Sequence, residues 1–528
     1  MQVKNIIIVG GGSSGWMAAS YLSKTVPNVN ITLVESKNVP IVGVGESTLS
    51  SINRFLKSLD IQEKDWMPRC NAVYKTSIRF TDFYEKGKHY YQMLKPVRAP
   101  VEMDHINDFY YLCHQHPESF SPFEFPKFFD DYYQMVDENR YTFDSGPMNW
   151  CPKVEKAYHF DAYKFGLALK DLVAIPNGVN HIEDDIYAIR TDDIGITGLE
   201  TRENGCLTAD LYIDCSGFRS LLLEQALKVE YVDFTDKMVN DRALATNIPY
   251  EDIRNELNSY TDCIAMPNGW IWNIPNWERI GTGYVYSSKF IDDESAEIEF
   301  RNKLKERYGA RADNLEFKKI SFVPGVRKQP WYKNVVGVGL SCGFIEPLRS
   351  TGLLVTHEML EKLAGILNNS DLNVKNFDRQ FYNKNVIDLL KTARDWVSTH
   401  YSLSKRNDTP YWKYVTEDVD YEADSEYYKN IFDVLNFDTD IGIQDSPRKD
   451  SYSNKMLFNK TRLYRSLASG GYGCYTKVDY ERDKKSNPFL YQRIEKIRND
   501  WKYRNRTIQE YINTLPNYYD LLKETIYK

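Results

Sequence analysis

The chain has 528 residues, of which 42% are apolar and 14% are aromatic, with a formal net charge of −7. This length exceeds what one hydrophobic core organises, so two or three structural units are expected. Charges of both signs are spread along the chain without a basic stripe, which argues against a nucleic-acid partner. No apolar stretch approaches the roughly 18 residues that a membrane span needs, so no membrane partner is expected.

The eight cysteines are scattered along the chain, and no CxxC or Cys/His cluster occurs. Zinc sites have such spacings, so no metal site is expected. Scattered cysteines in a long chain are typical of a reducing compartment, and the cytoplasm is the predicted location.

The N-terminal segment has the pattern of a βαβ unit with a glycine-rich turn. A short apolar strand, Asn5–Val9, leads into GGGSSG at 10–15, an apolar helix pattern and a second strand that ends at Glu35. Such glycines let the backbone approach a pyrophosphate, the helix start holds its charge, and the acid accepts from a ribose hydroxyl. The alternative is a glycine-rich turn without a ligand. The candidate dinucleotide-binding residues are Gly10, Gly12, Ser13, Ser14, Gly15 and Glu35.

A second glycine-rich loop, PIVGVGES at 40–47, follows and precedes a helical run at 48–59. Because it lies so close to the first loop in the sequence, it is predicted to cross the same cofactor. The alternative is an ordinary loop in which Ser47 caps the helix. The candidate residues are Gly43, Val44, Gly45, Glu46 and Ser47.

Lys75 lies in a strand-like segment, CNAVYKTSIRF at 70–80. A lysine in such a run usually faces solvent. If it is buried instead, its pKa falls and the amine becomes reactive. Residues 84–150, rich in aromatic residues, Pro, His and Asp, are predicted to form irregular loops and short helices.

Two turns in the middle of the chain carry polar residues next to regular elements. Asp161 is a predicted N-cap for a helix over 162–173. The strand at 211–213 ends in DCSG, where Asp214 and Gly217 could bring backbone close to a nucleotide. A simple turn would explain the same residues.

The segment WIWNIP at 270–275 is a predicted strand with Trp270 and Trp272 two residues apart. Side chains two residues apart on a strand point to the same face. The pair therefore belongs either to a core or to the wall of a cofactor site.

The stretch VGLSCGFIEPLRSTG at 338–352 is predicted to connect a buried strand, interrupted at Gly339, to a helix over 353–366. Backbone N–H groups at a helix start can hold an anion, which makes Thr351 and Gly352 candidates for such a cradle. An ordinary strand–loop–helix connection is the alternative.

The last third of the chain has helix periodicity without sheet signals. Helices are predicted over 374–396, 425–435 and 460–467, and 490–522 is predicted as two helices broken near Pro516.

Together these motifs resemble the flavin-dependent halogenases, especially the tryptophan-halogenase-like group. The likeness extends over residues 1–412. The combination WxWxIP with FxxPxxSxG is far more specific than the dinucleotide fingerprint, which flavin monooxygenases share. The resembling segments are GGGSSGWMAA at 10–19, GVGEST at 43–48, CNAVYKTSIRF at 70–80, YHFDAYKF at 158–165, LYIDCSGFRS at 211–220, WIWNIP at 270–275, GTGYVYSS at 281–288, GFIEPLRSTG at 343–352 and HYSLSKRNDTPYW at 400–412.

The resemblance implies a mixed α/β (α+β) architecture: an FAD-binding, Rossmann-like fold of the GR2-type flavin monooxygenases with an added, mostly helical substrate-binding subdomain. We expect residues 1–365 to form the FAD-binding domain, with inserted loops and helices around 84–150. Residues 366–528 are expected to form the helical subdomain over the substrate pocket.

The resemblance also implies a chemistry. A separate flavin reductase supplies FADH2, oxygen and halide yield hypohalous acid at the flavin, and Lys75 then presents electrophilic halogen to a small aromatic substrate, either by hydrogen bonding or as a haloamine. The implied halide-binding residues are Thr351 and Gly352. Candidate catalytic residues are Lys75, Glu346 and Ser350. Residues implied to separate flavin from substrate are Trp270, Trp272, Ile274 and Pro275. Further implied FAD contacts are Asp214, Gly217 and Gly339.

The sequence departs from the family at one catalytic position. Members that act on tryptophan usually carry Glu immediately before Ser-Thr-Gly, facing the lysine, whereas this chain has Arg349. The nearest carboxylate is Glu346. We hypothesise that Arg349 faces Lys75 and lowers its pKa by like-charge repulsion. The alternative is that Arg349 points to solvent and that water or the substrate takes the ring proton.

The leading prediction is an FADH2- and O2-dependent halogenase of indole- or phenol-type compounds that favours bromide or iodide. Bromide and iodide are favoured because they are more easily oxidised than chloride. Free tryptophan is not the predicted substrate, because residues 84–150 and 413–528 contain no match to the aromatic clamp that holds it in the tryptophan enzymes. One alternative is a flavin monooxygenase without halide chemistry. Another is a catalytically silent flavin-binding protein. A homo-oligomer is compatible with the long charged helices.

Overall fold

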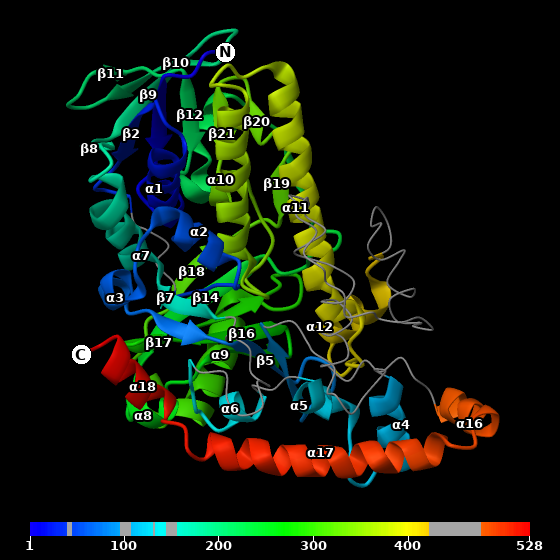
Figure 1. Ribbon diagram of the computed structural model, residues 1–528. Helices are drawn as coiled ribbons and strands as arrows, with labels where there is room; N and C mark the ends of the chain where they lie inside the picture. The colour runs from blue at the N-terminus through cyan, green and yellow to red at the C-terminus, as the bar shows by residue number, and fades with distance from the viewer. Residues whose placement is uncertain (40–44, 95–106, 130–132, 144–155, 422–476) are drawn as a thin grey trace.

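A computed structural model describes residues 1–39, 45–94, 107–129, 133–143, 156–421 and 477–528 (Figure 1). Gly43 and Val44, and the helices expected over 425–435 and 460–467, lie outside these ranges. Across the ranges that are described, every helix is too short or too polar to cross a membrane.

A six-stranded sheet in the order β20-β21-β12-β1-β2-β8 forms the upper layer in Figure 1. Neighbouring strands from β21 to β8 run parallel, and β20 is antiparallel to β21. The central strand β1 (NIIIV) is apolar on both faces because Ile6 and Ile8 pack into the main core while Ile7 and Val9 pack into a second cluster. The strands are β1 (Asn5–Val9), β2 (Asn30–Glu35), β8 (Asn180–Glu183), β12 (Leu211–Asp214), β20 (Trp331–Tyr332) and β21 (Val335–Gly337).

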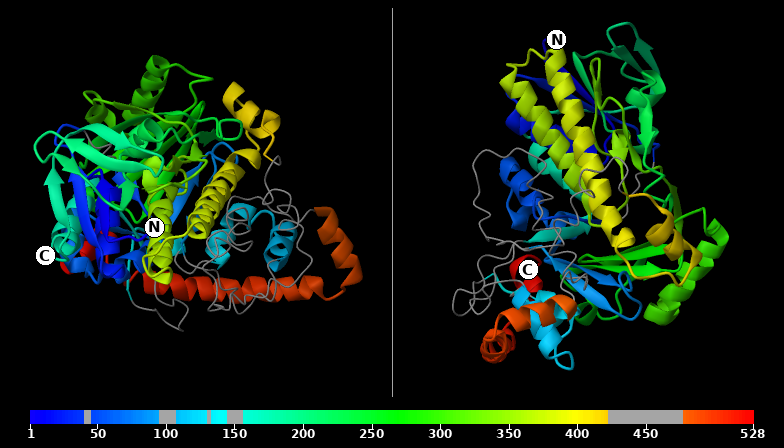
Figure 2. Two further views of the ribbon diagram at one scale, coloured as in Figure 1. Left: turned by 90° about the horizontal axis from the view of Figure 1, so that it is seen from above. Right: turned by 90° about the vertical axis from the view of Figure 1, so that its right-hand side faces the viewer.

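Helices cover one face of this sheet, and a small antiparallel sheet covers the other. Figures 1 and 2 show α10 and α11 side by side along the sheet, with α1 between β1 and the lower layers. The helices are α1 (Ser13–Thr25), α2 (Ile52–Leu59), α3 (Glu63–Trp66), α7 (Ala162–Leu169), α10 (Thr351–Asn369) and α11 (Asn376–Ser402). The small sheet contains β9 (Ile186–Thr191), β10 (Ile196–Thr201) and β11 (Cys206–Leu207).

A seven-stranded sheet in the order β18-β14-β17-β16-β15-β5-β6 forms the lower layer. On one face Ile264, Ile271 and Tyr284 pack under α9. Trp270 and Trp272 belong to the main core on the opposite face. The elements are β5 (Ser77–Thr81), β6 (His89–Met93), β14 (Arg242–Pro249), β15 (Tyr260–Met266), β16 (Gly269–Pro275), β17 (Arg279–Tyr286), β18 (Lys318–Ser321) and α9 (Asp293–Tyr308).

Two three-stranded sheets join these layers. One, in the order β3-β7-β4, contacts the seven-stranded sheet through β3. Its strands are β3 (Gly45–Ser47), β4 (Val73–Lys75) and β7 (Ala157–Asp161). The other contains β13 (Tyr231–Asp233), β19 (Gly325–Arg327) and β22 (Gly343–Phe344).

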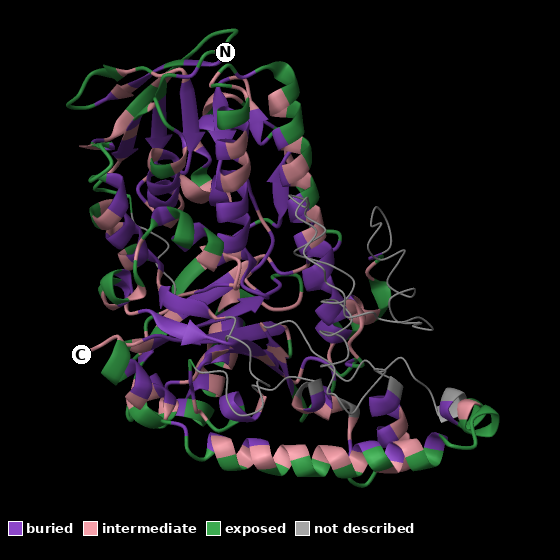
Figure 3. Ribbon diagram, viewed as in Figure 1, coloured by how far each residue is buried: buried purple, intermediate pink, exposed green. Residues whose placement is uncertain are grey.

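The C-terminal helices pack back on the rest of the chain. Figure 3 shows α17 along the lower edge with buried, intermediate and exposed positions alternating along it. The boundary expected at residue 365 falls inside α10, which is continuous, and residues from both sides of that boundary share the main core. The regular elements described after residue 370 are all helical: α11, α12 (Pro410–Lys413), α16 (Lys477–Ser486), α17 (Leu490–Ile512), α18 (Tyr518–Thr525) and a π-helical turn (Tyr414–Asp418).

One local expectation was wrong, one alternative is excluded, and two expectations were confirmed. Part of 84–150 is a strand, β6, which pairs with β5 rather than forming a loop. Ser47 lies in β3 and does not cap a helix, because α2 begins later with Ser51 at its N-cap position. The side chain of Asp161 accepts from the N–H of Lys164 and caps α7 as expected. Short helices in the described part of 84–150 are α4 (Asn107–Gln115), α5 (Phe125–Phe129) and α6 (Tyr133–Asp137).

Candidate active site

The turn between β1 and α1 has the shape that a dinucleotide needs. Gly10 adopts φ +111°, and a side chain there would meet the carbonyl oxygen of Cys215 at 2.5 Å. A side chain at Gly15 would lie 1.8 Å from the Gly10 carbonyl oxygen, whereas the space in front of Gly12 is open. The turn is therefore closed on the protein side and free where a pyrophosphate would approach the start of α1.

Glu35 ends β2 beside this turn, where a ribose is expected. Its Oε1 lies 2.7 Å from His181 Nε2, and the His181 ring packs against Trp16. Ser13 donates to the carbonyl of Ala162 at 2.9 Å, which fixes α1 against α7. These residues fit an FAD adenosine end, with His181 orienting the carboxylate.

Asp214 lies at the edge of the sheet where the cofactor is expected. It pairs with Val9 at the end of β12, next to Gly10. Its carboxylate accepts from the backbone N–H groups of Ser216, Leu222 and Leu223 at 2.8–3.1 Å. The Asp214 side chain is thus engaged in shaping the turn, and the expected contact of this residue with FAD stays a prediction.

Gly217 and Gly339 both adopt a positive φ near this edge. The space in front of Gly217 (φ +68°) is open. A side chain at Gly339 (φ +72°) would meet Ser14 Oγ at 2.3 Å. Gly339 therefore allows the 338–352 stretch to approach the start of α1 closely.

The loop before α10 ends in two consecutive non-glycine residues with left-handed backbone, Arg349 (φ 75°) and Ser350 (φ 59°). Such a conformation is uncommon and needs support from its surroundings. The support comes from Ser350 N–H, which donates to Pro347 O at 2.9 Å, and from Thr351 Oγ1, which donates to Glu346 O at 3.3 Å. Helix α10 then begins at Thr351 without a side-chain cap, and the space in front of Gly352 is open.

Lys75 lies at the end of β4 and is fully buried. Its Nζ donates to Thr48 O at 2.8 Å and to Ser350 Oγ at 2.9 Å, which places the amine beside the loop that starts α10. Burial, which the charge of Arg349 reinforces and a contribution from Cys263 opposes, lowers the pKa of Lys75 to about 7. The expectation that a strand lysine faces solvent is wrong here, and the buried alternative holds.

Arg349 is buried and does not point to solvent. Its guanidinium carbon lies 4.2 Å from the ring centroid of Trp396 and 5.5 Å from that of Phe80, and its Nε donates to His400 Nε2. Since that nitrogen of His400 accepts, the other nitrogen donates to Tyr90 OH at 3.0 Å. Burial and the charge of Arg349 hold the pKa of His400 well below its usual range.

Glu346 and the Lys75 amine have different hydrogen-bond partners. Its carboxylate accepts from Tyr401 OH at 2.6 Å and from Asn240 Nδ2 at 2.9 Å. The hydrogen-bond partners of Lys75 among the described residues are Thr48 and Ser350, not Glu346. Burial raises the pKa of Glu346 to about 7, although its interactions with Tyr401, Asn240 and Trp270 oppose that rise.

Trp270 and Trp272 form an aromatic wall on the face of β16 that lies opposite α9. Both are buried, with ring centroids 6.2 Å apart, as expected for side chains two residues apart on a strand. Trp272 pairs with Gly283 of β17, where any side chain would lie 2.1 Å from the indole. Ile274 is on the same face, and the carbonyl of Pro275 lies 3.1 Å from His159 Nδ1.

Several polar residues at the site were not singled out in the sequence, notably His159, Thr261, Cys263 and His400. Thr261 and Cys263 follow the period-2 spacing of β15, but that pattern does not reveal which face of the strand carries chemistry. Burial raises the pKa of Cys263, whose environment includes the charges of Lys75 and Arg349.

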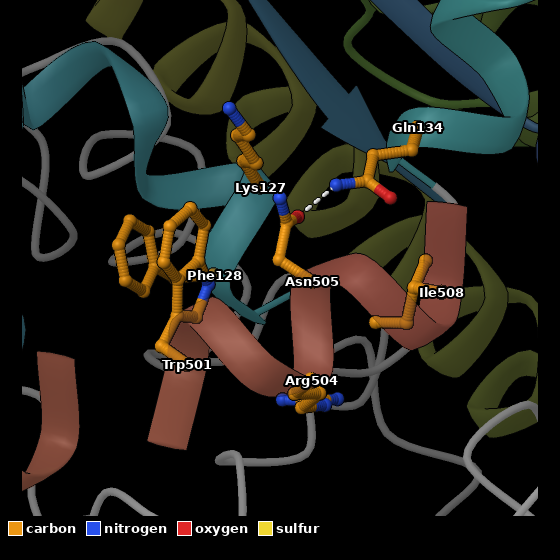
Figure 4. A pocket seen from close by; sticks show the side chains of 7 residues that line it. All are labelled: Lys127, Phe128, Gln134, Trp501, Arg504, Asn505 and Ile508. Atoms are coloured by element: carbon orange, nitrogen blue, oxygen red, sulfur yellow. Dashed lines mark hydrogen bonds between the residues drawn. The ribbon is translucent and has the colours of Figure 1, made fainter. Parts of the chain in front are cut away.

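Two other features of the molecule stand apart from this site. A small depression between α17 and α5–α6 is lined by Lys127, Phe128, Gln134, Trp501, Arg504, Asn505 and Ile508 (Figure 4). Its polar side chains Gln134 and Asn505 are bonded to each other. In the described chain, His357, Glu358 and Glu361 also come together, but Arg54 bonds both carboxylates.

In this fold, the glycine-rich turn between β1 and α1 belongs to a parallel sheet, and the site also contains a buried lysine and a tryptophan wall. This combination defines a flavin-dependent oxidoreductase. The comparisons specify the class further. The tryptophan halogenase family model matches residues 5–463. The 7-chloro-L-tryptophan 6-halogenase KtzR of Kutzneria sp. (strain 744) is 36% identical over 428 residues, covering 77% of this chain and 81% of that protein.

Solved structures agree with the family match. The VirX1 apo structure is 37% identical and aligns with a TM-score of 0.87 over 100% of both chains. The tryptophan 6-halogenase SttH of Streptomyces toxytricini is 30% identical, with a TM-score of 0.79 over 98% of this chain and 99% of that one. The chain therefore belongs to the tryptophan halogenase family, and it is a flavin-dependent halogenase of that type with an FAD-binding fold.

Proposed function

We propose that this enzyme halogenates small electron-rich aromatic compounds through Lys75, using hypohalous acid made from halide, oxygen and FADH2 from a separate reductase. The observation that carries the proposal is the buried Lys75 amine, held by Ser350 at the start of α10. Oxygen activation for the oxidation of halide to hypohalous acid is the chemistry that the bound reduced flavin supplies.

The start of α10 supports a halide-binding role for Thr351 and Gly352. Unsatisfied N–H groups of a helix start and the positive end of the helix dipole favour an anion. The open space in front of Gly352 leaves room for one. Ser350 lies between this position and Lys75, so hypohalous acid formed here would be close to the amine.

The environment of Lys75 supports a role for its neutral amine. With a pKa near 7, about half of the amine is neutral at pH 7, whereas an ordinary lysine is almost fully charged. The neutral nitrogen can attack the halogen of hypohalous acid: an N–X bond forms, the O–X bond breaks, and the leaving hydroxide takes one amine proton as water. Transfer of X to the aromatic ring then regenerates the amine, which receives the ring proton.

The tryptophan wall supports the separation of flavin from substrate. Trp270 and Trp272 pack on the sheet face that belongs to the main core rather than under α9. Bulky indoles here would keep an aromatic substrate from direct oxygenation and leave halogen transfer through Lys75 as the productive route.

Bromide and iodide are the proposed favoured halides, because they oxidise more readily than chloride. Indoles and phenols are the proposed substrate class, since electrophilic halogen reacts with electron-rich rings. The aromatic substrates named for relatives such as KtzR agree with this class at a coarse level.

The test is aerobic turnover with FAD, a flavin reductase, NADH, equal chloride, bromide and iodide, and a panel of indoles and phenols. Wild type, Lys75→Ala and a surface control, Lys384→Ala, are compared by mass spectrometry and a peroxide assay. We expect brominated or iodinated product from wild type and the control, and peroxide without halogenated product from Lys75→Ala.

Other outcomes identify other functions. Hydroxylated product would indicate a monooxygenase without halide chemistry. Peroxide without any product from wild type, across the whole panel, would indicate a flavin-binding protein without halogenase activity. Full halogenation by Lys75→Ala would exclude the proposed role of Lys75.

A further inference from the structure

A row of hydrogen-bonded hydroxyl groups extends from Lys75 to a histidine on the strand paired with its own. Lys75 Nζ lies 2.9 Å from Ser350 Oγ, which lies 2.9 Å from Ser47 Oγ. Ser47 Oγ lies 2.7 Å from Thr261 Oγ1, and Thr261 Oγ1 lies 2.8 Å from His159 Nε2. Each hydroxyl of this row has one proton, so the direction in which it donates is a property of the whole row.

The histidine end fixes that direction. The carbonyl of Pro275 can only accept, so His159 Nδ1 carries the proton in the 3.1 Å contact with it. Burial holds the pKa of His159 well below its usual range, so the ring is neutral and Nε2 can only accept. Thr261 therefore donates to the ring and Ser47 donates to Thr261. Ser350 in turn donates to Ser47.

The direction of the row determines how the Lys75 amine is held. Ser350 must accept from Lys75, because its proton points away toward Ser47. The other partner of the amine, the carbonyl of Thr48 at 2.8 Å, can also only accept. Two N–H groups are thus bound, and Nζ has no third hydrogen-bond partner among the residues that the structure describes. On the neutral amine, the position that remains is the lone pair.

The fold holds these side chains in place and keeps them away from solvent. Lys75 and His159 are fully buried, and Ser350, Ser47 and Thr261 are 7%, 5% and 4% exposed. Ser47 and His159 are opposite each other in the β3–β7 ladder, and Thr261 belongs to β15 of the adjacent sheet. Buried hydroxyls with both partners supplied by the protein form a rigid network.

We propose that His159 is a positioning residue which, through the three hydroxyls, keeps the lone pair of the Lys75 amine free for halogen. This inference rests on the proposed function, in which the neutral amine attacks the halogen of hypohalous acid. No proton moves along the row, and His159 stays neutral as a fixed acceptor. If the row pointed the other way, Ser350 would donate to the nitrogen and occupy its lone pair, and halogen transfer would first have to break that bond.

The row and the charged groups near Lys75 act on different properties of the amine. Arg349 and Cys263 act on its pKa, together with burial, and so on the fraction that is neutral. The row of hydroxyls sets the direction of the lone pair. A loss of positioning therefore lowers turnover at a pH where the amine is already neutral, whereas a loss of burial moves the pH profile upward.

Matched pairs of variants reverse or keep the direction of the row. His159→Leu and Thr261→Val each remove one link, so the remaining hydroxyls are satisfied only if they donate toward Lys75. His159→Gln keeps a neutral acceptor and a donor for Pro275, and Thr261→Ser keeps the hydroxyl. The control is Thr201→Val, which removes a buried hydroxyl of β10 in the small antiparallel sheet.

Two measurements on the full-length protein loaded with FAD follow the lone pair. The first is the pH profile of halogenated product between pH 6 and 9, with a flavin reductase, NADH, bromide and an indole. The second is the rate at which cyanate carbamylates Lys75 at pH 8.5, because only a free amine lone pair attacks isocyanic acid. Peptide mass spectrometry compares this rate with that of the exposed Lys384.

We expect His159→Leu and Thr261→Val to lose about tenfold in both rates above pH 8, without a rise in the midpoint of the halogenation profile. His159→Gln, Thr261→Ser and Thr201→Val should keep the wild-type rates. Retention of the wild-type rates in His159→Leu and Thr261→Val would overturn the positioning role. A midpoint raised toward the ordinary lysine value, with full recovery of turnover, would also overturn it, since that marks a loss of burial.

The glutamine variant tests whether an acceptor is sufficient. A loss in His159→Gln as large as that in His159→Leu would contradict the proposal, because a fixed neutral acceptor would then not replace the histidine. Carbamylation of Lys75 does not depend on halogenation. If Lys75→Ala still halogenates, the proposed function fails, whereas equal carbamylation of wild type and His159→Leu makes the positioning role fail, so the two failures are distinguishable.

Discussion

Arg349 and Lys75 are two buried cations of one site, and the charge of Arg349 adds to burial in lowering the pKa of Lys75. The guanidinium is held by the ring of Trp396 and by His400. Arg349 thus acts on the lysine through its charge. The hypothesis that it points to solvent is excluded by its burial.

Replacing Arg349 should move the pH dependence of halogenation upward. Arg349→Gln removes a like charge, so the pKa of Lys75 rises and less neutral amine is present at pH 7. Arg349→Glu should raise the pKa further. We expect turnover at pH 7 to fall by about three- to tenfold and to recover near pH 9.

The measurement is the pH profile of halogenated product, with thermal unfolding to verify the fold. Arg394→Gln is the matched control, because Arg394 is also buried and lies over the ring of Phe234. An Arg349→Glu profile identical to that of wild type would refute the electrostatic role.

Lys75 should make stability depend on pH in a defined window. Its pKa falls from the usual 10.5 to about 7, so the folded chain binds fewer protons than the unfolded chain between these values. The unfolding free energy therefore rises with pH there, by about 1.4 kcal/mol per unit from this one group. Below pH 7 the full penalty of burying the charge remains.

Lys75→Met should remove this slope and be more stable than wild type at pH 7, on the order of a few kcal/mol. Denaturant unfolding from pH 6.5 to 9.5 measures the difference between the two proteins. Lys384→Met replaces an exposed lysine and should keep the wild-type slope. A Lys75→Met slope equal to that of wild type would mean that the amine is not buried in solution.

Glu346 should make the unfolding free energy fall as pH rises, in a lower pH interval than the one set by Lys75. Its pKa rises from 4.5 to about 7, so the folded chain binds more protons than the unfolded chain in that interval. Stability from this group is present below pH 4.5 and falls as pH rises through 7. Glu346→Gln should flatten this part of the unfolding curve relative to wild type, whereas the exposed control Glu306→Gln should not. Equal slopes in all three proteins would contradict the assigned burial.

Gly283→Ala should disturb the tryptophan wall directly. The new methyl group would meet the Trp272 indole at 2.1 Å, so the ring must move. We expect a loss of about 1–3 kcal/mol in unfolding free energy. If the wall separates flavin from substrate, more peroxide or hydroxylated product per NADH should also be released.

The control is Gly365→Ala in α10, where the space in front of the glycine is open. A helical Gly-to-Ala change with room for the methyl group should stabilise by up to about 1 kcal/mol. Wild-type product ratios in Gly283→Ala, despite a lower melting temperature, would restrict Trp272 to a packing role.

Local patterns in the sequence were sufficient for the parts of the fold that depend on neighbours in the chain. The glycine turn between β1 and α1, the Asp161 cap and the shared face of Trp270 and Trp272 follow from short-range geometry. Pairing of β6 with β5 was missed because two adjacent tyrosines, Tyr90 and Tyr91, are both buried and break the alternation of the strand.

The tertiary structure decided the environment of Lys75, because its partners are distant along the chain. Ser350 is 275 residues from Lys75, Ser47 is 303 from Ser350, and His159 is 102 from Thr261. Residue spacing carries no information on such contacts, and burial, which controls the pKa of the amine, exists only once the layers have packed. The sequence by itself determined the cofactor class and the candidate lysine. Only the tertiary structure, in which β3, β4, β7 and β15 pack around the start of α10, decided that this lysine is buried. The same packing lowers the pKa of the lysine and connects it to a histidine through hydrogen bonds.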